Sequence, residues 1–165
     1  GDSSAELHEG FFLGISNPVN ATIAHGDGLA TILNDDVISL VLEDSSPIVN
    51  QAAALDSIFF NRDPFRIVSV PELFASGSDP NTRVMLFVKN LELNPGENSS
   101  AVIVRMIGSN NQVFEVPAEN FSPVPDTDLM QLVFRLPDNL PPGSCAIFIR
   151  SHGRISNLGT IRIAP

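Results

Sequence analysis

The chain has 165 residues, of which 43% are hydrophobic, and its formal net charge is −10. This length and composition allow one large domain or two small ones with a packed core. No window approaches about 18 consecutive apolar residues, so the sequence predicts no membrane insertion.

Period-two alternation of side-chain character recurs along the chain and predicts half-buried β-strands. The segments that show it, in chain order, are 11–16, 84–89, 102–106, 130–136, 145–149 and 159–163. Turn signals separate the runs, among them Asn17-Pro18, Asp79-Pro80 and Pro141-Pro142-Gly143. Gly26-Asp27-Gly28 is read as a hairpin turn, because glycine tolerates positive φ there. Only Val49 to Leu55, with three consecutive alanines, is expected to form a short helix.

Many short strands at this spacing, with thirteen prolines in the chain, indicate an all-β fold of antiparallel sandwich type. We place a domain boundary near Asp36, where an acid-rich region gives way to a new apolar run. The expected organisation is a first domain at 1–36, a linker or edge strand at 37–53, and a sandwich at 54–165. Residues 1–36 hold too few strands to bury a core. They either borrow a sheet from the larger domain or belong to a domain that continues upstream.

The charge is unevenly distributed along the chain. Residues 1–44 contain eight of the 19 acids and no Lys or Arg, whereas the other residues contain eleven acids and all nine bases. Phosphate-binding surfaces need clustered Lys and Arg, so nucleic acid is not an expected partner. An acid-only segment is instead suited to divalent cations.

The residues expected in catalytic or transition-metal sites are sparse. Cys145 is the single cysteine, which excludes an intrachain disulfide and a CxxC zinc site. It shares a predicted strand face with Ile147 and Ile149, so we expect it in the core, not acting as a nucleophile with His152 as base. Nucleophile-elbow and phosphate-cradling motifs do not occur in the sequence. The sequence therefore predicts a protein that is not an enzyme.

The run GDSSAELHEGFFLGISNPVNATIAHGDGLATILNDD, residues 1–36, resembles the C-terminal part of a Calx-beta domain. The resemblance lies in the spaced acids, the Ser-Asn-Pro turn, and the NATI, GxG and TILNDD segments. It implies the last strands of an immunoglobulin-like sandwich that often binds Ca²⁺ and occurs as repeats in large surface proteins.

Calcium ligands follow from the same resemblance. Carried over to this chain, the candidates are Asp2, Glu6, Glu9, Asp35 and Asp36. Calcium needs roughly six to eight oxygens, and adjacent aspartates point to opposite sides of an extended segment. Both can reach one ion only where the chain bends out of the sheet. The alternative is that Asp35-Asp36 is the polar end of a strand.

Residues 54–165 resemble, less specifically, an immunoglobulin-like C-terminal module of large secreted bacterial proteins. The segments DSIFFNRDPFRIVSV, TRVMLFVKNLELNPGENSSAVIV and LPPGSCAIFIRSHGRISNLGTIRI carry this likeness, and the last is also similar to IPT/TIG domains. The resemblance implies an accessory or structural role.

Three functions are compatible with these observations. The leading hypothesis is a non-catalytic structural or adhesive module, extracellular or at a bacterial cell surface, whose partners are other protein domains. A second is a subunit of an extracellular fibre, in which residues 1–36 complete a sheet of an identical subunit by strand addition. A third is an accessory domain of a secreted enzyme.

Overall fold

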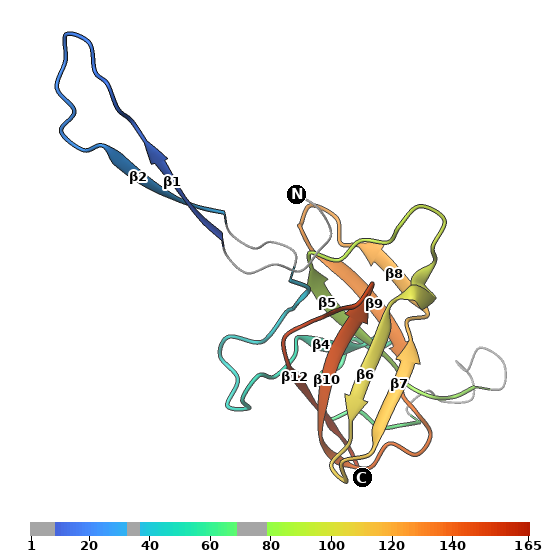
Figure 1. Cartoon of the computed structure of the whole chain (residues 1–165). Helices are drawn as coiled ribbons and strands as arrows, with labels where there is room; N and C mark the ends of the chain where they lie inside the picture. Colours follow the sequence, from blue (N-terminus) through green and yellow to red (C-terminus); the bar gives the residue numbers. More distant parts are fainter. Residues whose placement is uncertain (1–8, 33–36, 69–78) are drawn as a thin grey trace. The chain divides into compact units, whose positions relative to one another are not determined.

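The computed structural model describes residues 9–32, 37–68 and 79–165. It divides into two compact units, Gly1–Val37 and Ile38–Pro165 (Figure 1). Among the described residues, no helix has the length and apolar character needed to cross a membrane.

The first unit contains an antiparallel hairpin of β1 (Glu9–Gly14) and β2 (Asp27–Ile32). Directly opposite residues of such a pair share a face, which places Phe11 with Ala30 on one side and Phe12 with Leu29 on the other. Large apolar side chains are exposed on both sides, and Phe12 is 77% exposed. This hairpin therefore presents apolar surface within the described structure.

The turn prediction at Gly26-Asp27-Gly28 is wrong. Asp27 and Gly28 pair with Gly14 and Leu13 inside the hairpin, so the connection is formed by residues 15–26. Its left-handed backbone positions are Asn17, with φ of 56°, and Asn20, with φ of 55°. Asparagine is enriched there because its short polar side chain bonds locally to the backbone.

The second unit consists of two antiparallel sheets that lie face to face (Figure 1). In the first sheet, β3 and β4 both pair with one edge of β5, followed by β9 and β8. In the second sheet, β11 and β12 pair with one edge of β10, followed by β6 and β7. The first-sheet strands are β3 (Ser39–Leu40), β4 (Ala54–Asp56), β5 (Arg83–Lys89), β8 (Asn120–Pro123) and β9 (Met130–Arg135). The second-sheet strands are β6 (Ile103–Ile107), β7 (Val113–Pro117), β10 (Gly143–Ser151), β11 (Arg154–Ile155) and β12 (Gly159–Ile163).

Alternate side chains of the central strands fill the space between the sheets. The apolar faces predicted for this unit are buried, with fully enclosed side chains at Val84, Leu86, Val104, Leu132, Phe134, Cys145, Ile147 and Ile149, whereas Phe11 and Leu13 of the predicted strand 11–16 are exposed. The predicted all-β antiparallel sandwich is therefore confirmed. A short 3-10 helix, η2 (Ser99–Ala101), precedes β6.

Residues 38–65 pass back and forth between the two sheets. Ile38 and Leu40 enter the core beside β5, then residues 50–52 pair in parallel with β12 through hydrogen bonds that join Ala52 and Asn50 to Thr160. The chain returns to β5 as β4, and Phe65 pairs with β12 again. The prediction of a helix at Val49–Leu55 is wrong, because the backbone of this segment forms hydrogen bonds with strands of both sheets.

Phe134 tests the core directly, since it is fully buried on β9 while its neighbour Val133 lies on the outward face. We expect Phe134→Ala to lower the free energy of unfolding by about 3–5 kcal/mol, because it removes apolar burial and leaves a cavity. Urea titration followed by circular dichroism measures this, as the chain lacks Trp and Tyr. The control Val133→Ala should cost less than half as much. Equal losses would contradict the described register.

Candidate functional site

The predicted calcium ligands lie almost wholly outside the described residues. Asp2, Glu6, Asp35 and Asp36 fall in the ranges 1–8 and 33–36, and Glu9 is described only by its backbone at the start of β1. Within 9–32, 37–68 and 79–165, no group of three or more His, Cys, Asp or Glu side chains is placed to hold a metal ion. The calcium site therefore stays a prediction.

Cys145 lies in the core, as its strand face predicted. Burial raises the pKa of its thiol to about 12, which keeps it protonated and a poor nucleophile. His152 lies beyond the other end of β10, about 23 Å away at the rise of an extended strand. The two side chains are not brought together.

His152 belongs to a polar cluster at a turn. It occupies the two-residue turn between β10 and β11 with Gly153, and both residues have positive φ, as a type I′ hairpin requires. Its Nε2 lies 2.8 Å from Glu97 Oε2, and its Nδ1 lies 3.2 Å from Ser151 Oγ. A backbone bond from Asn94 and the contact with His152 hold the pKa of Glu97 below its usual range. Ser151 is buried, so this serine–histidine–glutamate contact joins two loops and offers no accessible nucleophile.

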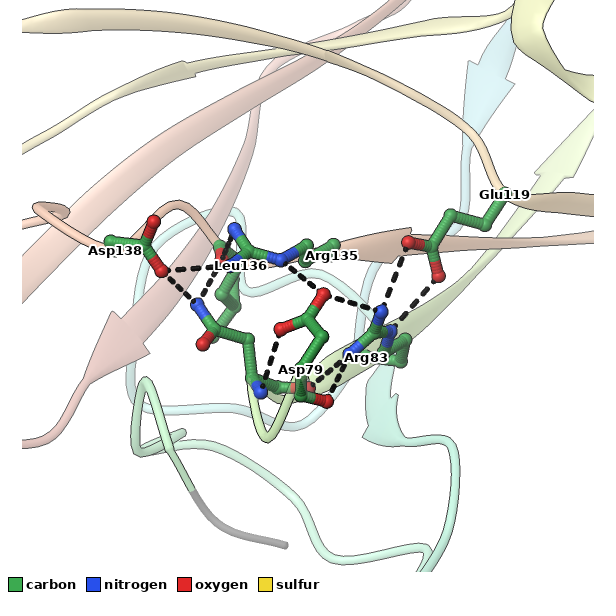
Figure 2. Close-up of polar contacts among 7 residues, drawn as sticks. Asp79, Arg83, Glu119, Arg135, Leu136 and Asp138 are labelled. Carbon is green, nitrogen blue, oxygen red and sulfur yellow. Dashed lines mark hydrogen bonds and ion pairs between the residues drawn. The ribbon is translucent and has the colours of Figure 1, made fainter. Parts of the chain in front are cut away.

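A larger charged cluster joins the ends of β5 and β9 (Figure 2). Arg83 and Arg135 lie directly opposite each other, and like charges in this position are destabilising. Asp79 lies between them, with its Oδ2 accepting from Arg135 Nε at 2.7 Å and Arg83 Nη2 at 2.8 Å. Glu119 pairs with Arg83 and Asp138 with Arg135. Three carboxylates thus compensate an arginine pair that the register imposes.

The arginines also shift the acidity of this cluster. Hydrogen bonding to Arg135, helped by Asn81 and Arg83, lowers the pKa of Asp79 to about 2. The Arg135 and Asn81 side chains likewise hold the pKa of Asp138 below its usual range. Because every ionic group has its partner within the cluster, the arrangement is best suited to fixing the loop ends.

A third cluster attaches the chain before β5 to β12. The side chain of Asp63 is 3% exposed, and its Oδ2 accepts from the backbone N–H of Arg162 at 2.8 Å and from its Nε at 3.2 Å. Gln51 donates to the other oxygen of Asp63 at 2.6 Å and contacts Ser46 Oγ through its own carbonyl oxygen. A buried carboxylate needs such partners, since burying it unpaired would cost several kcal/mol.

The loop that follows β4 is held by its first residue, Asp56. Its Oδ1 accepts from the backbone N–H groups of Ile58 and Phe59, at 2.8 and 2.9 Å. Its own N–H and C=O bond to Asn61 and Phe60. Phe60 has φ of 56°, an uncommon value for a bulky residue that costs about 1–3 kcal/mol and persists only where its surroundings enforce it.

This loop exposes three consecutive apolar side chains beside a pocket. Ile58 is 42% exposed, Phe59 44% and Phe60 63%. The pocket has a volume of about 350 Å³ and is lined by Asp56, Phe59, Asn61, Arg62, Pro64, Phe65 and Arg66. We call it the Phe59 pocket. It is a concave site whose lining includes two phenylalanines and two arginines, which makes it the candidate functional site.

This pocket was not predicted from the sequence. The available signal was the run Ile58-Phe59-Phe60, which breaks period-two alternation between the turn-forming residues Ser57 and Asn61. Three consecutive apolar residues in a turn cannot all face the core. The approach of Pro64–Arg66 to this loop depends on pairing with β12, about a hundred residues away, which no local pattern reveals.

Comparison with known proteins returns no relative. No protein-family model matches the chain, and no curated protein or solved structure is significantly similar to it. The Calx-beta and IPT/TIG resemblances therefore stay predictions.

The depressed pKa of Asp79 predicts a specific loss of stability in acid. A carboxyl whose pKa is lower in the folded state stabilises fully above its ordinary value of 3.8, and this contribution disappears as pH falls toward about 2. We expect Asp79→Asn to be less stable than wild type at pH 7, with the difference vanishing near pH 2. Circular-dichroism melts across this range measure it. The control Asp126→Asn changes an exposed aspartate outside the cluster and should leave stability at pH 7 unchanged, and a difference for Asp79→Asn that persists below pH 2 would contradict the assignment.

Proposed function

We propose that this chain is a non-catalytic structural or adhesive module of a bacterial cell-surface or secreted protein. The observation that carries the proposal is the second unit's sandwich, whose core is apolar and which has ion pairs that join strand ends and loops. Such a body holds its shape and presents loops to other proteins. The residue resemblances of 1–36 and 54–165 support the same role.

Calcium is part of the proposal. A Ca²⁺ ion would be held by Asp2, Glu6, Glu9, Asp35 and Asp36 and would stiffen the end of the first domain. Support comes from the acid-only composition of residues 1–44 and from the preference of Ca²⁺ for carboxylate oxygen.

We expect EDTA to lower the melting temperature of the chain and added CaCl₂ to restore it. Binding to the native state alone stabilises by about 2.7 kcal/mol at a free calcium concentration one hundred times Kd. Asp35→Asn/Asp36→Asn should abolish the response, whereas the matched double change Glu92→Gln/Asp126→Asn should retain it. A melting temperature that does not change when EDTA is added would contradict the calcium role.

A second function, assembly through the hairpin of β1 and β2, is favoured by its exposed apolar side chains. Phe11, Phe12, Leu13 and Leu29 are each at least 49% exposed, which is a feature of sheets completed by another strand or sheet. In this version identical subunits supply the missing sheet and build a fibre.

Assembly predicts that the purified chain sediments as species larger than a monomer. Phe11→Ser/Leu13→Ser should shift sedimentation toward the monomer, because it makes one hairpin face polar. Val19→Ser changes a more exposed apolar residue outside the two strands and should leave assembly intact. Monomeric behaviour of wild type at all concentrations would rule out the fibre.

A further inference from the structure

We propose that the Phe59 pocket binds a carboxylate carried on an apolar group, as in a peptide whose acidic or C-terminal residue lies beside an aromatic or aliphatic side chain. The inference rests on the adhesive part of the proposed function and names the chemistry that this surface would recognise. Its volume of about 350 Å³ is within the range of pockets that enclose small ligands.

The apolar part of the pocket is rigidly held. Phe65 forms part of the lining and is only 3% exposed, with its backbone N–H and C=O bonded to Arg162 and Ala164 at 2.9 and 2.7 Å. Phe59 lines the pocket from the other segment and remains 44% exposed. An apolar side chain that entered here would contact the exposed ring of Phe59 beside the Phe65 segment, whose backbone is already fixed.

Arg66 supplies the principal cationic group. It is exposed and lines the pocket, and its guanidinium has no carboxylate partner among the described residues. Its backbone is held through bonds from Thr82, whose Oγ1 donates to Arg66 O at 2.6 Å and whose N–H donates to Ile67 O. A guanidinium presents paired N–H donors that match a planar carboxylate, which favours this anion.

The other charged groups around the pocket do not oppose the binding of a carboxylate. Arg62 uses one N–H for Glu43 at 2.9 Å, but its side chain stays 69% exposed and keeps further donors. Asp56 Oδ1 accepts from the two backbone N–H groups of its loop, and the residue is 5% exposed. An anion in the pocket would therefore lie near the guanidinium groups of Arg62 and Arg66. The one nearby carboxylate, Asp56, is hydrogen-bonded within its own loop.

The loop conformation also indicates a formed site. Asp56 closes the loop with four hydrogen bonds and places Phe60 at positive φ, so Phe59 is set beside Pro64–Arg66 before any ligand arrives. Such preorganisation lowers the entropic cost of binding. Exposed aromatic side chains next to arginine are also the composition enriched at protein-binding surfaces.

The test uses the intact chain and three probes followed by NMR chemical shifts. N-acetylphenylalanine carries a terminal carboxylate, N-acetylphenylalaninamide is its neutral match, and acetyl-Phe-Glu-amide carries the carboxylate on a side chain. We expect the two carboxylate probes to shift resonances of residues 58–66 and the amide to bind at least about tenfold more weakly, because it loses a charge-assisted hydrogen bond. The better of the two carboxylate probes identifies a peptide terminus or an acidic side chain as the ligand.

Variants assign the contacts. Arg66→Ala should weaken carboxylate binding about tenfold, Arg66→Lys should restore part of it, and Phe59→Ala should weaken the amide and carboxylate probes alike. Arg150→Ala removes an arginine paired with Glu115 on the second sheet and should leave binding unchanged. Equal binding of amide and carboxylate, shifts confined to residues away from the pocket lining, or no shifts with any probe would overturn the proposal. Those results would leave the calcium and sedimentation experiments to decide the proposed function independently.

Discussion

Packing of alternate side chains between two sheets is the constraint on which the second unit depends. Successive side chains of a strand point to opposite faces of the sheet. Each inward-facing residue of β5, β6, β9 and β10 therefore places its neighbours on the outer face. The core position of Phe134 thus requires Arg135 to point outward, opposite Arg83. The charged cluster of Figure 2 is a consequence of this register, since Asp79, Glu119 and Asp138 offset a repulsion that the core imposes.

The strands could be predicted because their signal is local. Runs such as 84–89 and 145–149 show their alternation over a few residues, and burial of one face is the largest favourable term available to such segments. The short segments 38–65 carry no comparable signal. Ala52-Ala53-Ala54 has high helix propensity, but propensities are worth only tenths of a kcal/mol per residue, and pairing with β12 and β5 outweighs them.

The prediction of a turn at Gly26-Asp27-Gly28 was wrong for a related reason. Glycine permits positive φ without requiring it, and Asn17 and Asn20 occupy the positive-φ positions in the hairpin loop.

The polar clusters could not be derived in the same way, because they join residues distant in sequence, and the pocket, although lined by residues 56–66, depends on the distant pairing of Phe65 with β12. Asp63 meets Arg162 across 99 positions, and His152 meets Glu97 across 55. A single sequence shows which residues are charged, but it does not show which of them lie close together in the folded chain. The candidate calcium ligands are a different case, since a family resemblance named them and the described residues do not include their side chains.

The Asp63 cluster and the Phe59 pocket are coupled through the backbone. Asp63 fixes its segment to β12 through Arg162, and Phe65, two residues later, pairs with the same strand while lining the pocket. The opposite wall is attached to β5 through Asp56 and through the Ser57 N–H bond to Arg83 O. The pocket therefore lies where segments attached to different sheets meet, and its width depends on how the sandwich is packed. A change in the core between β5 and β12 would alter the spacing of Phe59 and Phe65 without touching either ring, whereas a substitution on the outer face of β10 would not.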